Sequence, residues 1–374
     1  MIALLAVCCK GTDVTDDGQD GSGLTAPEVP AFVRGADVSW VSEMEKDGKT
    51  FKTATGIPTD LFKLLADIGL DAVRLRVWVN PRGGYCDKHD VLLKAQRAKA
   101  LGMDVMIDFH YSDYWADPGK QFIPEAWKEH TYEEMLDDVR QHTLDVLTLL
   151  RDGGIQPKWV QVGNETSNGM LWSVKMDPKT GWEWKDENGR TQIVEYMGHL
   201  EKNPEQYAGF FKAGYEAVKK VYPDAICIVH LDNGFDRALY DWNLGILRDG
   251  GIDYDIVGMS LYPMAAVEWH ADKVSSATDA IDKCIANIKH VYEAFGKPCM
   301  IAEVGVKVEQ AEEGRELLTD VIQKARNQTD GHCLGVLYWE PEAPFNYNGG
   351  YDMGAFLAKD KLCQPTVIMD AFAQ

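Results

Sequence analysis

Two glutamates in the chain have the residue type and the sequence position for acid–base and nucleophilic chemistry. Glu165 follows the apolar run Trp159-Val-Gln-Val-Gly-Asn164, and Glu303 ends the apolar segment Cys299-Met-Ile-Ala302. A carboxylate at the end of a buried strand is costly to ionise unless it is paired or functional. Either glutamate alone could simply pair with a buried arginine. The two together, with Asn164 beside one of them, favour hydrolysis of a glycosidic bond, in which one carboxyl group donates a proton and the other attacks the anomeric carbon.

Two arginines alternate with apolar residues in the segment Val73-Arg-Leu-Arg-Val77, so both side chains point to the same side of a strand. If that side is the interior of the fold, at least one arginine must contact a carboxylate, because a lone buried cation is costly. Glu303 is the expected partner of Arg74, since a neighbouring cation lowers the pKa of a carboxyl group and keeps it ionised as a nucleophile. The alternative is a structural ion pair with Asp37 or Asp71.

Other polar and aromatic residues also follow predicted strands, where they could bind a sugar. His110, Asp113 and Trp115 share one loop, in which we expect hydrogen bonds to sugar hydroxyl groups; a purely structural histidine is the alternative. Tyr262 could hold the nucleophile by a hydrogen bond and Trp339 could pack against a sugar ring, unless both simply pack at the rim. The expected substrate-binding residues are Asp37, Arg74, His110, Asp113, Trp115, Asn164, His230, Asn233, Tyr262 and Trp339.

These residues require a fold that brings the ends of many strands together. From residue 32 onward, short apolar segments alternate with amphipathic ones. The expected strands are 32–39, 72–79, 104–111, 158–164, 225–232, 255–262, 299–304 and 334–340, and the expected helices include 58–68, 89–101, 132–150, 204–221, 277–295 and 312–326. Such alternation predicts the α/β class and a single (β/α)8 TIM barrel domain over residues 32–374, with its chemistry at the C-terminal strand ends. A doubly wound open sheet is the alternative, but no glycine-rich phosphate turn follows the first strand.

The segment between Glu165 and the helix expected to begin at Pro204 is unusually long for a connection in such a barrel. Residues 175–189 carry Trp182 and Trp184 between turn-forming residues, a pattern that predicts a small hairpin. Because the segment follows the strand that ends near Glu165, we expect it to form a wall at one end of the substrate cleft. A loop packed on the side of the barrel is the alternative.

The charge and cysteine content exclude several classes of partner. The chain has 38 Lys and Arg residues against 59 Asp and Glu, a net charge of −21. That excess repels a phosphate backbone, which excludes general nucleic-acid binding and favours a neutral ligand. No Cys or His spacing is typical of a metal site, so no metal ligands are expected. The six cysteines after the N-terminal segment are expected to be buried free thiols.

The first 31 residues differ in character from the rest of the chain. Residues 1–7 are apolar but too few to span a bilayer, and Cys8 and Cys9 follow them. Leu5-Ala-Val-Cys8 resembles the bacterial lipobox, which predicts a lipid anchor on one of the two cysteines and a secreted or cell-surface lipoprotein. Residues 10–31 are rich in Gly, Asp and Thr and predict a flexible tether, so membrane contact is expected only through the anchor. Plain secretion or an expression-derived leader are the alternatives.

Two segments, Trp159-Val-Gln-Val-Gly-Asn-Glu165 and Ile301-Ala-Glu-Val-Gly305, resemble the superfamily of retaining (β/α)8 glycosidases with glutamates after strands four and seven. Four others more narrowly resemble glycoside hydrolase family 53, the arabinogalactan endo-β-1,4-galactanases. They are Gly35-Ala-Asp-Val-Ser39, Val73-Arg-Leu-Arg-Val-Trp78, Asp108-Phe-His-Tyr-Ser-Asp113 and Val336-Leu-Tyr-Trp-Glu-Pro341, and the similarity covers roughly residues 32–372. The resemblance implies a retaining glycosidase in which Glu165 is the acid/base and Glu303 the nucleophile. It also implies β-1,4-galactan, the side chain of type I arabinogalactan in pectin, as substrate, and no required cofactor.

Some members of this family carry calcium in a long loop near the last two strands. The loop Lys307–Gly314 lacks an alternating Asp/Asn pattern, so no calcium is expected there, although the segment Asn346–Asp352 could contribute oxygen ligands. Two other functions remain open from the residues alone: an endo-glycanase acting on mannan or cellulose, and a non-catalytic glycan-binding protein on the same barrel. We expect a monomer.

Overall fold

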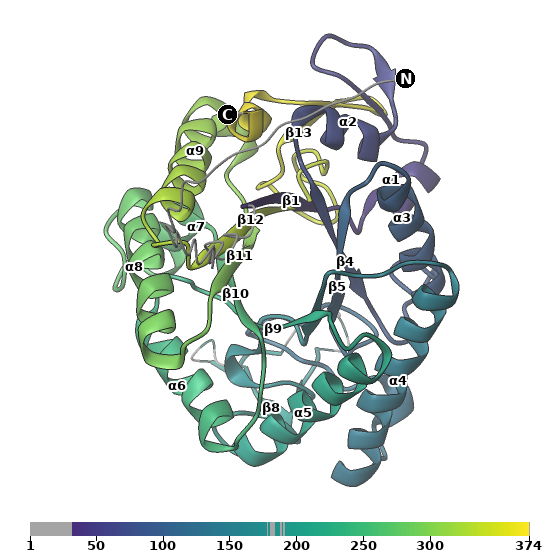
Figure 1. Ribbon diagram of the computed structural model, residues 1–374, viewed down its shortest axis with the longest axis vertical. Helices are drawn as coiled ribbons and strands as arrows, with labels where there is room; N and C mark the ends of the chain where they lie inside the picture. Colours follow the sequence, from purple (N-terminus) through teal and green to yellow (C-terminus); the bar gives the residue numbers. More distant parts are fainter. Residues whose placement is uncertain (1–31, 178, 180–183, 188, 190, 374) are drawn as a thin grey trace, which may run out of the picture. The chain divides into compact units, whose positions relative to one another are not determined.

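The computed structural model describes residues 32–177, 179, 184–187, 189 and 191–373, and these contain the predicted barrel. Eight parallel strands close on themselves in the order β1-β12-β11-β10-β9-β6-β5-β4 (Figure 1). Each corresponds to one expected strand, so the (β/α)8 prediction is confirmed. The expected anchor and tether lie outside the described residues. The barrel strands are β1 (Val33–Asp37), β4 (Ala72–Val77), β5 (Asp104–Phe109), β6 (Trp159–Val162), β9 (Ile226–Leu231), β10 (Ile256–Leu261), β11 (Cys299–Val304) and β12 (Cys333–Trp339).

Helices surround the strands (Figure 1), and side-chain caps fix where several of them begin. At the start of α4, Thr131 and Glu134 form a reciprocal capping box, and Ser276 caps α8 through the backbone N–H of Asp279. The long helices are α2 (Leu61–Ile68), α3 (Lys88–Ala100), α4 (Tyr132–Asp152), α5 (Pro204–Val221), α6 (Arg237–Asp249), α8 (Ala277–Phe295) and α9 (Ala311–Asn327); α1 (Val41–Lys46) and α7 (Pro263–Trp269) are short, and the 3-10 helices are η1 (Glu125–Trp127), η2 (Thr166–Asn168), η3 (Val308–Gln310) and η4 (Val367–Ala373).

The predicted helix over residues 58–68 begins too early. In the structure Pro58–Thr59 forms strand β3, and the helix starts only at Leu61. The side chain of Asp60 accepts a hydrogen bond from the backbone N–H of Lys63 and so fixes the helix start. The short strand belongs to a four-stranded sheet beside the barrel, in the order β13-β14-β2-β3, with β2 (Thr50–Lys52), β13 (Phe356–Lys359) and β14 (Leu362–Pro365).

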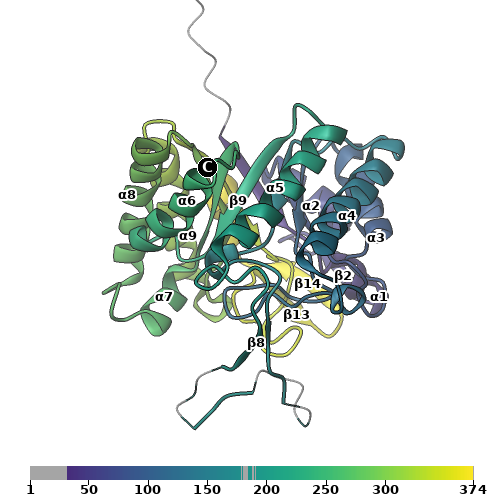
Figure 2. The same cartoon turned by 90° about the horizontal axis from the view of Figure 1, so that it is seen from below.

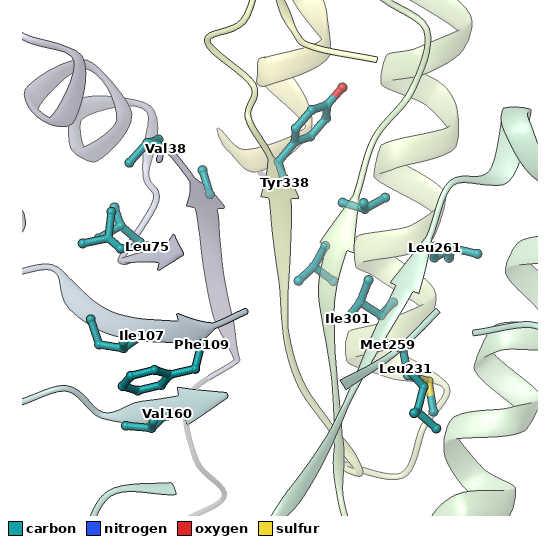
Figure 3. Packing of buried hydrophobic residues seen from close by; sticks show 14 of the residues in the cluster. Val38, Leu75, Ile107, Phe109, Val160, Leu231, Met259, Leu261, Ile301 and Tyr338 are labelled. Atoms are coloured by element: carbon teal, nitrogen blue, oxygen red, sulfur yellow. The ribbon is translucent and has the colours of Figure 1, made fainter. Parts of the chain in front are cut away.

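Two apolar clusters hold the barrel together. The larger one lies between the strands and the helices, where residues such as Leu75, Phe109 and Ile301 are fully buried (Figure 3). The smaller one contains residues of alternate strand positions, Ala72 but not Val73, for example. Since neighbouring strand residues point to opposite faces, this second cluster fills the inside of the barrel. It is made of Val33, Ala72, Met106, Trp159, Ile228, Ile256, Met300 and Leu337.

Polar side chains replace apolar ones inside the barrel toward the C-terminal strand ends. Two residues beyond Ala72 on β4 comes Arg74, and two residues beyond Met106 on β5 comes Asp108; both polar side chains are buried. The strands β1, β6, β9 and β10 repeat this change, with Asp37, Gln161, His230 and Ser260 as the buried polar residues. Inside the barrel, an apolar layer is therefore followed by a charged layer at the C-terminal ends of the strands. Any chemistry lies at those C-terminal ends, as expected from the sequence.

The long segment after Glu165 forms an antiparallel hairpin whose two strands lie on either side of residues 175–189, where the hairpin was predicted. Strands β7 (Ser173–Val174) and β8 (Ile193–Glu195) pair in antiparallel register. Figure 2 shows β8 beyond the same end of the barrel as α7, the helix that directly follows β10. The hairpin thus lies on the catalytic face rather than on the side of the barrel. Trp182 falls outside the described residues. Among the described helices, none has the length and apolar character needed to cross a membrane.

Candidate active site

β6 ends in a left-handed turn that carries Glu165. Gly163 has φ 85° and Glu165 has φ 44°. Glycine is needed at position 163, because a Cβ there would lie 2.5 Å from Cγ2 of Thr166. A positive φ is uncommon for a residue other than glycine, and such strained residues concentrate at functional sites. The turn leaves Glu165 partly exposed at the mouth of the barrel.

Glu303 is the penultimate residue of β11 and is only 4% exposed. The pairing of β10 with β11 shifts between Met259 and Ser260, so that Ser260 lies opposite Glu303. Irregularities of this kind often re-aim side chains beside active sites. The hydroxyl group of Tyr262, just beyond β10, donates a hydrogen bond of 2.8 Å to Oε2 of Glu303. This is the contact proposed for Tyr262 from the sequence.

Arg74 joins three carboxylates in the upper layer of the barrel. Its Nη1 lies 2.9 Å from Oε1 of Glu303 and 2.9 Å from Oδ2 of Asp37. Its Nη2 lies 2.9 Å from Oδ2 of Asp108. Arg74 therefore contacts both of the partners considered for it in the barrel interior, Glu303 and Asp37. The other candidate, Asp71, instead pairs with Arg34 near the surface.

The two glutamates have different electrostatic surroundings. Burial and the neighbouring carboxylates of Glu303 and Asp232 raise the pKa of Glu165 well above its ordinary value, while a hydrogen bond from Ser260 acts in the opposite direction. Burial also raises the pKa of Glu303, to about 7, but there Arg74 and Tyr262 both lower it. A carboxyl group that keeps its proton beside one that a cation helps to ionise is the arrangement of an acid and a nucleophile.

Asn164 and His230 fix the turn that carries Glu165. The amide oxygen of Asn164 accepts a 2.8 Å hydrogen bond from Nη2 of Arg74, and its Nδ2 donates to the carbonyl oxygen of Ala116 at 2.8 Å. Nδ1 of His230 accepts from the backbone N–H of Glu165 at 3.2 Å. Burial lowers the pKa of His230 well below its ordinary value, so the ring stays neutral and can act as this acceptor.

His110 is buried and contacts other site residues through both ring nitrogens. Nε2 lies 3.0 Å from Oδ2 of Asp108, and Nδ1 accepts from Nε1 of Trp78 and from the backbone N–H of Ala116, each at 3.2 Å. These contacts make His110 a positioning residue for Asp108 and Trp78. Direct hydrogen bonding from His110 to a sugar hydroxyl remains a prediction.

Asp113 and Asn233 lie in two different cavities of the catalytic face. The carboxylate of Asp113 accepts hydrogen bonds of 2.9 Å from the backbone N–H groups of Asn80 and Glu125, and it lines a cavity of about 1210 Å³. Asn233, with φ 46°, lines a second cavity of about 350 Å³, which Glu165 also lines. Its Nδ2 donates to Oδ2 of Asp232 at 2.5 Å. The roles of both residues toward a substrate remain predictions.

A group of aromatic rings lies at the larger cavity. The ring centroid of Trp339, at the end of β12, lies 5.2 Å from that of Trp40 and 5.8 Å from that of Trp115. Trp40 and Trp115 also line the larger cavity, whereas Trp339 is partly exposed beside them. Packing of a sugar ring against Trp339 remains a prediction.

Several residues of the site were not among the sequence-derived candidates. Asp108 and Glu340 stand at strand ends, where polar residues were expected to gather, but neither was assigned a role from the sequence. Gln161 lies inside β6 and donates a hydrogen bond to Asp108. No sequence pattern marks Gln161 or Trp40, because their contacts depend on how the barrel closes; Ser260 stands at a predicted strand end but was given no role.

The described residues hold no group of three or more His, Cys, Asp or Glu side chains that could bind a metal ion. In the segment Asn346–Asp352, the single carboxylate belongs to Asp352. Calcium takes six to eight oxygen ligands and usually several carboxylates, so this segment does not fit a calcium site. The six cysteines expected to be buried thiols are buried and free: Cys86, Cys227, Cys284, Cys299, Cys333 and Cys363.

The site of two glutamates on a (β/α)8 barrel is that of a glycosidase. Comparison with known proteins shows to which glycosidase family the chain belongs. The model of glycosyl hydrolase family 53 matches residues 33–316. The chain therefore belongs to glycosyl hydrolase family 53, and the family resemblance read from the sequence is confirmed.

Relatives of similar length and known structures agree with this assignment. The chain is 33% identical over 341 residues to an arabinogalactan endo-beta-1,4-galactanase of Cellvibrio japonicus (strain Ueda107), covering 84% of this chain and 81% of that one. It is 32% identical over 334 residues to an uncharacterized protein from the bgaB 5' region of Niallia circulans, covering 83% and 84%. A solved structure from work on two fungal beta-1,4-galactanases matches with a TM-score of 0.75 and 27% identity, covering 91% of this chain and 99% of that one.

Proposed function

We propose that this protein is a retaining endo-β-1,4-galactanase that cleaves the galactan side chains of type I arabinogalactan. The observation that carries the proposal is the pair of glutamates with unlike surroundings. Glu303 lies beside Arg74 and Tyr262, whereas the carboxylates of Glu303 and Asp232 act on Glu165. The named relatives of the family, which act on arabinogalactan, support galactan as the substrate. A neutral polysaccharide also suits a chain with a net charge of −21.

In the proposed first step, Glu303 attacks the anomeric carbon while Glu165 donates its proton to the leaving oxygen. The bond from the anomeric carbon to that oxygen breaks, and a glycosyl ester forms on Glu303. In the second step Glu165, now ionised, removes a proton from a water molecule that attacks the same carbon and releases Glu303. Two inversions give net retention. Arg74 and Tyr262 hold the Glu303 carboxylate in place, because each binds one of its two oxygens.

The direct test measures reducing-sugar release from potato galactan, galactomannan and carboxymethylcellulose side by side. Galactan should be hydrolysed far faster than the other two polymers. Comparable release from galactomannan or carboxymethylcellulose would favour the alternative endo-glycanase, and release from none of them would favour a glycan-binding protein. The matched control is the Glu303→Ala variant, which should bind galactan without cleaving it.

We further propose that Cys8 or Cys9 carries a lipid that anchors the protein at the cell surface. The sequence Leu5-Ala-Val-Cys8 and the Gly-, Asp- and Thr-rich residues 10–31 support this proposal. The protein expressed in a bacterial host should incorporate radioactive palmitate and sediment with membranes. The Cys8→Ser/Cys9→Ser double variant should lose both properties, and label that survives in it would contradict the anchor. A monomer is also proposed, because one chain supplies every residue of the site; light scattering after gel filtration checks the mass.

A further inference from the structure

The two cavities of the catalytic face differ greatly in size. The larger measures about 1210 Å³ and the smaller about 350 Å³. The larger is lined by residues of the β1, β4 and β5 loops together with the hairpin of β7 and β8, among them Trp78, Tyr114, Trp115, Val174, Met176 and Val194. The smaller is lined by residues of the β6, β9 and β10 ends. The unequal volumes imply that the two halves of a bound chain are held unequally.

The position of Glu165 shows which half of the substrate each cavity receives. Glu165 lines the smaller cavity, together with Asp232 and the 63% exposed Trp269. The acid must lie against the oxygen of the departing sugar, so the leaving group extends into this smaller cavity. Neither glutamate lines the larger cavity, which lies beyond Trp40 and Trp115. It is therefore left for the sugars on the non-reducing side of the cleaved bond.

The buried side chain of Arg76 packs against three tryptophan rings that line the larger cavity. The guanidinium carbon of Arg76 lies 4.2 Å from the ring centroid of Trp115, 5.2 Å from that of Trp78 and 5.4 Å from that of Trp40. Arg76 is only 1% exposed and pairs with the buried Glu340. A cation enclosed by three indole rings fixes their orientation. The rings therefore lose little conformational freedom when a ligand binds.

The hairpin supplies the outer wall of this cavity. The backbone N–H of Trp172, next to β7, donates a 2.9 Å hydrogen bond to the carbonyl oxygen of Gln121, which ties the hairpin to the β5 loop. Val194 is 52% exposed and Met176 is 39% exposed, and both line the cavity. Tyr114, which is 52% exposed, lines the same cavity. Apolar side chains exposed together around a concavity mark a binding surface.

We propose that this larger cavity binds several galactose residues on the non-reducing side of the cleaved bond, with the β7–β8 hairpin as its wall, and that the enzyme therefore cuts β-1,4-galacto-oligosaccharides near their reducing ends. The inference rests on the proposed function and adds the direction in which the chain lies. The apolar faces of successive galactopyranose rings pack on the aromatic lining, and the hairpin contacts the sugars farthest from the reaction centre.

The test uses β-1,4-galactohexaose carrying ¹⁸O at its reducing end, with the products of early cleavage analysed by mass spectrometry. Most of the label should appear in mono- and disaccharides. The Met176→Ser/Val194→Ser double variant should move cleavage toward the middle of the chain. It should also lower the ratio of kcat/KM for the hexaose to that for an aryl β-galactobioside by about five- to tenfold, the cost of losing contact with two apolar side chains. Trp242→Ala is the matched control, because this 42% exposed side chain lies on α6, outside both cavities, and should change neither quantity.

Label spread evenly over all products, or concentrated in the long ones, would overturn the inference while leaving the galactanase function intact. An equal loss on the hexaose and the galactobioside in the double variant would overturn the role of the hairpin. If the wild-type enzyme left galactohexaose intact, both the proposed function and the inference would fail.

Discussion

Nη1 of Arg74 lies 2.9 Å from Oε1 of Glu303, and this contact makes the two glutamates of the site chemically unequal. Partial burial of Glu165 and nearly complete burial of Glu303 raise the pKa of both carboxyl groups. The cation opposes that effect at Glu303, whereas the carboxylates of Glu303 and Asp232 reinforce it at Glu165. One fold thereby keeps a nucleophile and a proton donor side by side at the same pH.

The pH dependence of kcat/KM should follow from these two groups. Activity needs Glu303 ionised, so the rate should rise as the pH passes through its pKa of about 7, and it should fall at higher pH as Glu165 loses its proton. Arg74→Met removes the cation that lowers the pKa of Glu303, so the rising limb should move to higher pH. Arg74→Lys keeps the charge and should leave that limb near its wild-type position although the rate falls. Matching shifts in both variants would show that the charge of Arg74 is not the cause.

Tyr262→Phe should lower kcat by about 10- to 100-fold, because the variant loses the 2.8 Å hydrogen bond that holds Oε2 of Glu303. KM for galactan should change much less, since the ring itself remains. Stopped assays with galactan at several concentrations give both constants, and circular dichroism checks the fold. A variant with wild-type kcat would show that Arg74 alone positions the nucleophile.

Chemical rescue should separate the roles of the two glutamates. Glu303→Ala and Glu165→Ala should each lower kcat on galactan by a factor on the order of 1000 or more. On aryl galactosides with good leaving groups, Glu165→Ala should recover part of its activity, and azide should give a β-galactosyl azide through the surviving Glu303. A β-galactosyl azide formed instead by Glu303→Ala would mean that the two roles are reversed.

The ion pair of Arg76 with Glu340 should matter for folding. Both side chains are at most 1% exposed, so Glu340→Leu leaves a cation buried without its partner and should lower the free energy of unfolding by about 3–5 kcal/mol. The matched control is the exposed pair of Lys63 and Asp67 on α2, where Asp67→Asn should cost only about 0.3–0.5 kcal/mol. Urea unfolding of the three proteins measures both differences. Similar costs for the two variants would contradict a stabilising role for the buried pair.

The fold and the catalytic pair could be predicted from the sequence because both follow from local patterns. Apolar runs of strand length alternate with amphipathic segments, and polar residues such as Glu165 and Glu303 come where the runs end. A parallel barrel brings all those ends to one face. The boundary error at residues 58–60 has the same local origin, since the cap at Asp60 determines where α2 begins.

The contacts between the strand ends could not be predicted, because they depend on the closure of the barrel. Arg74 reaches Asp108 on β5 as well as Glu303 on β11, and no spacing in the sequence relates these strands. Likewise, three tryptophans enclose Arg76 only after the loops of β1, β4 and β5 meet. A hairpin that walls one end of the cleft was expected from the sequence, whereas the hydrogen bond from Trp172 to Gln121, which ties it to the β5 loop, was not.

The central claim is that Glu303 and Glu165 cleave β-1,4-galactan by double displacement, and the configuration of the first product tests it most directly. Proton NMR of galactan hydrolysis, recorded before the anomers equilibrate, resolves the new reducing ends. A nucleophilic carboxylate pair retains configuration, so the β anomer should appear first and the α anomer only later, at the rate of mutarotation. Initial release of the α anomer would contradict the account.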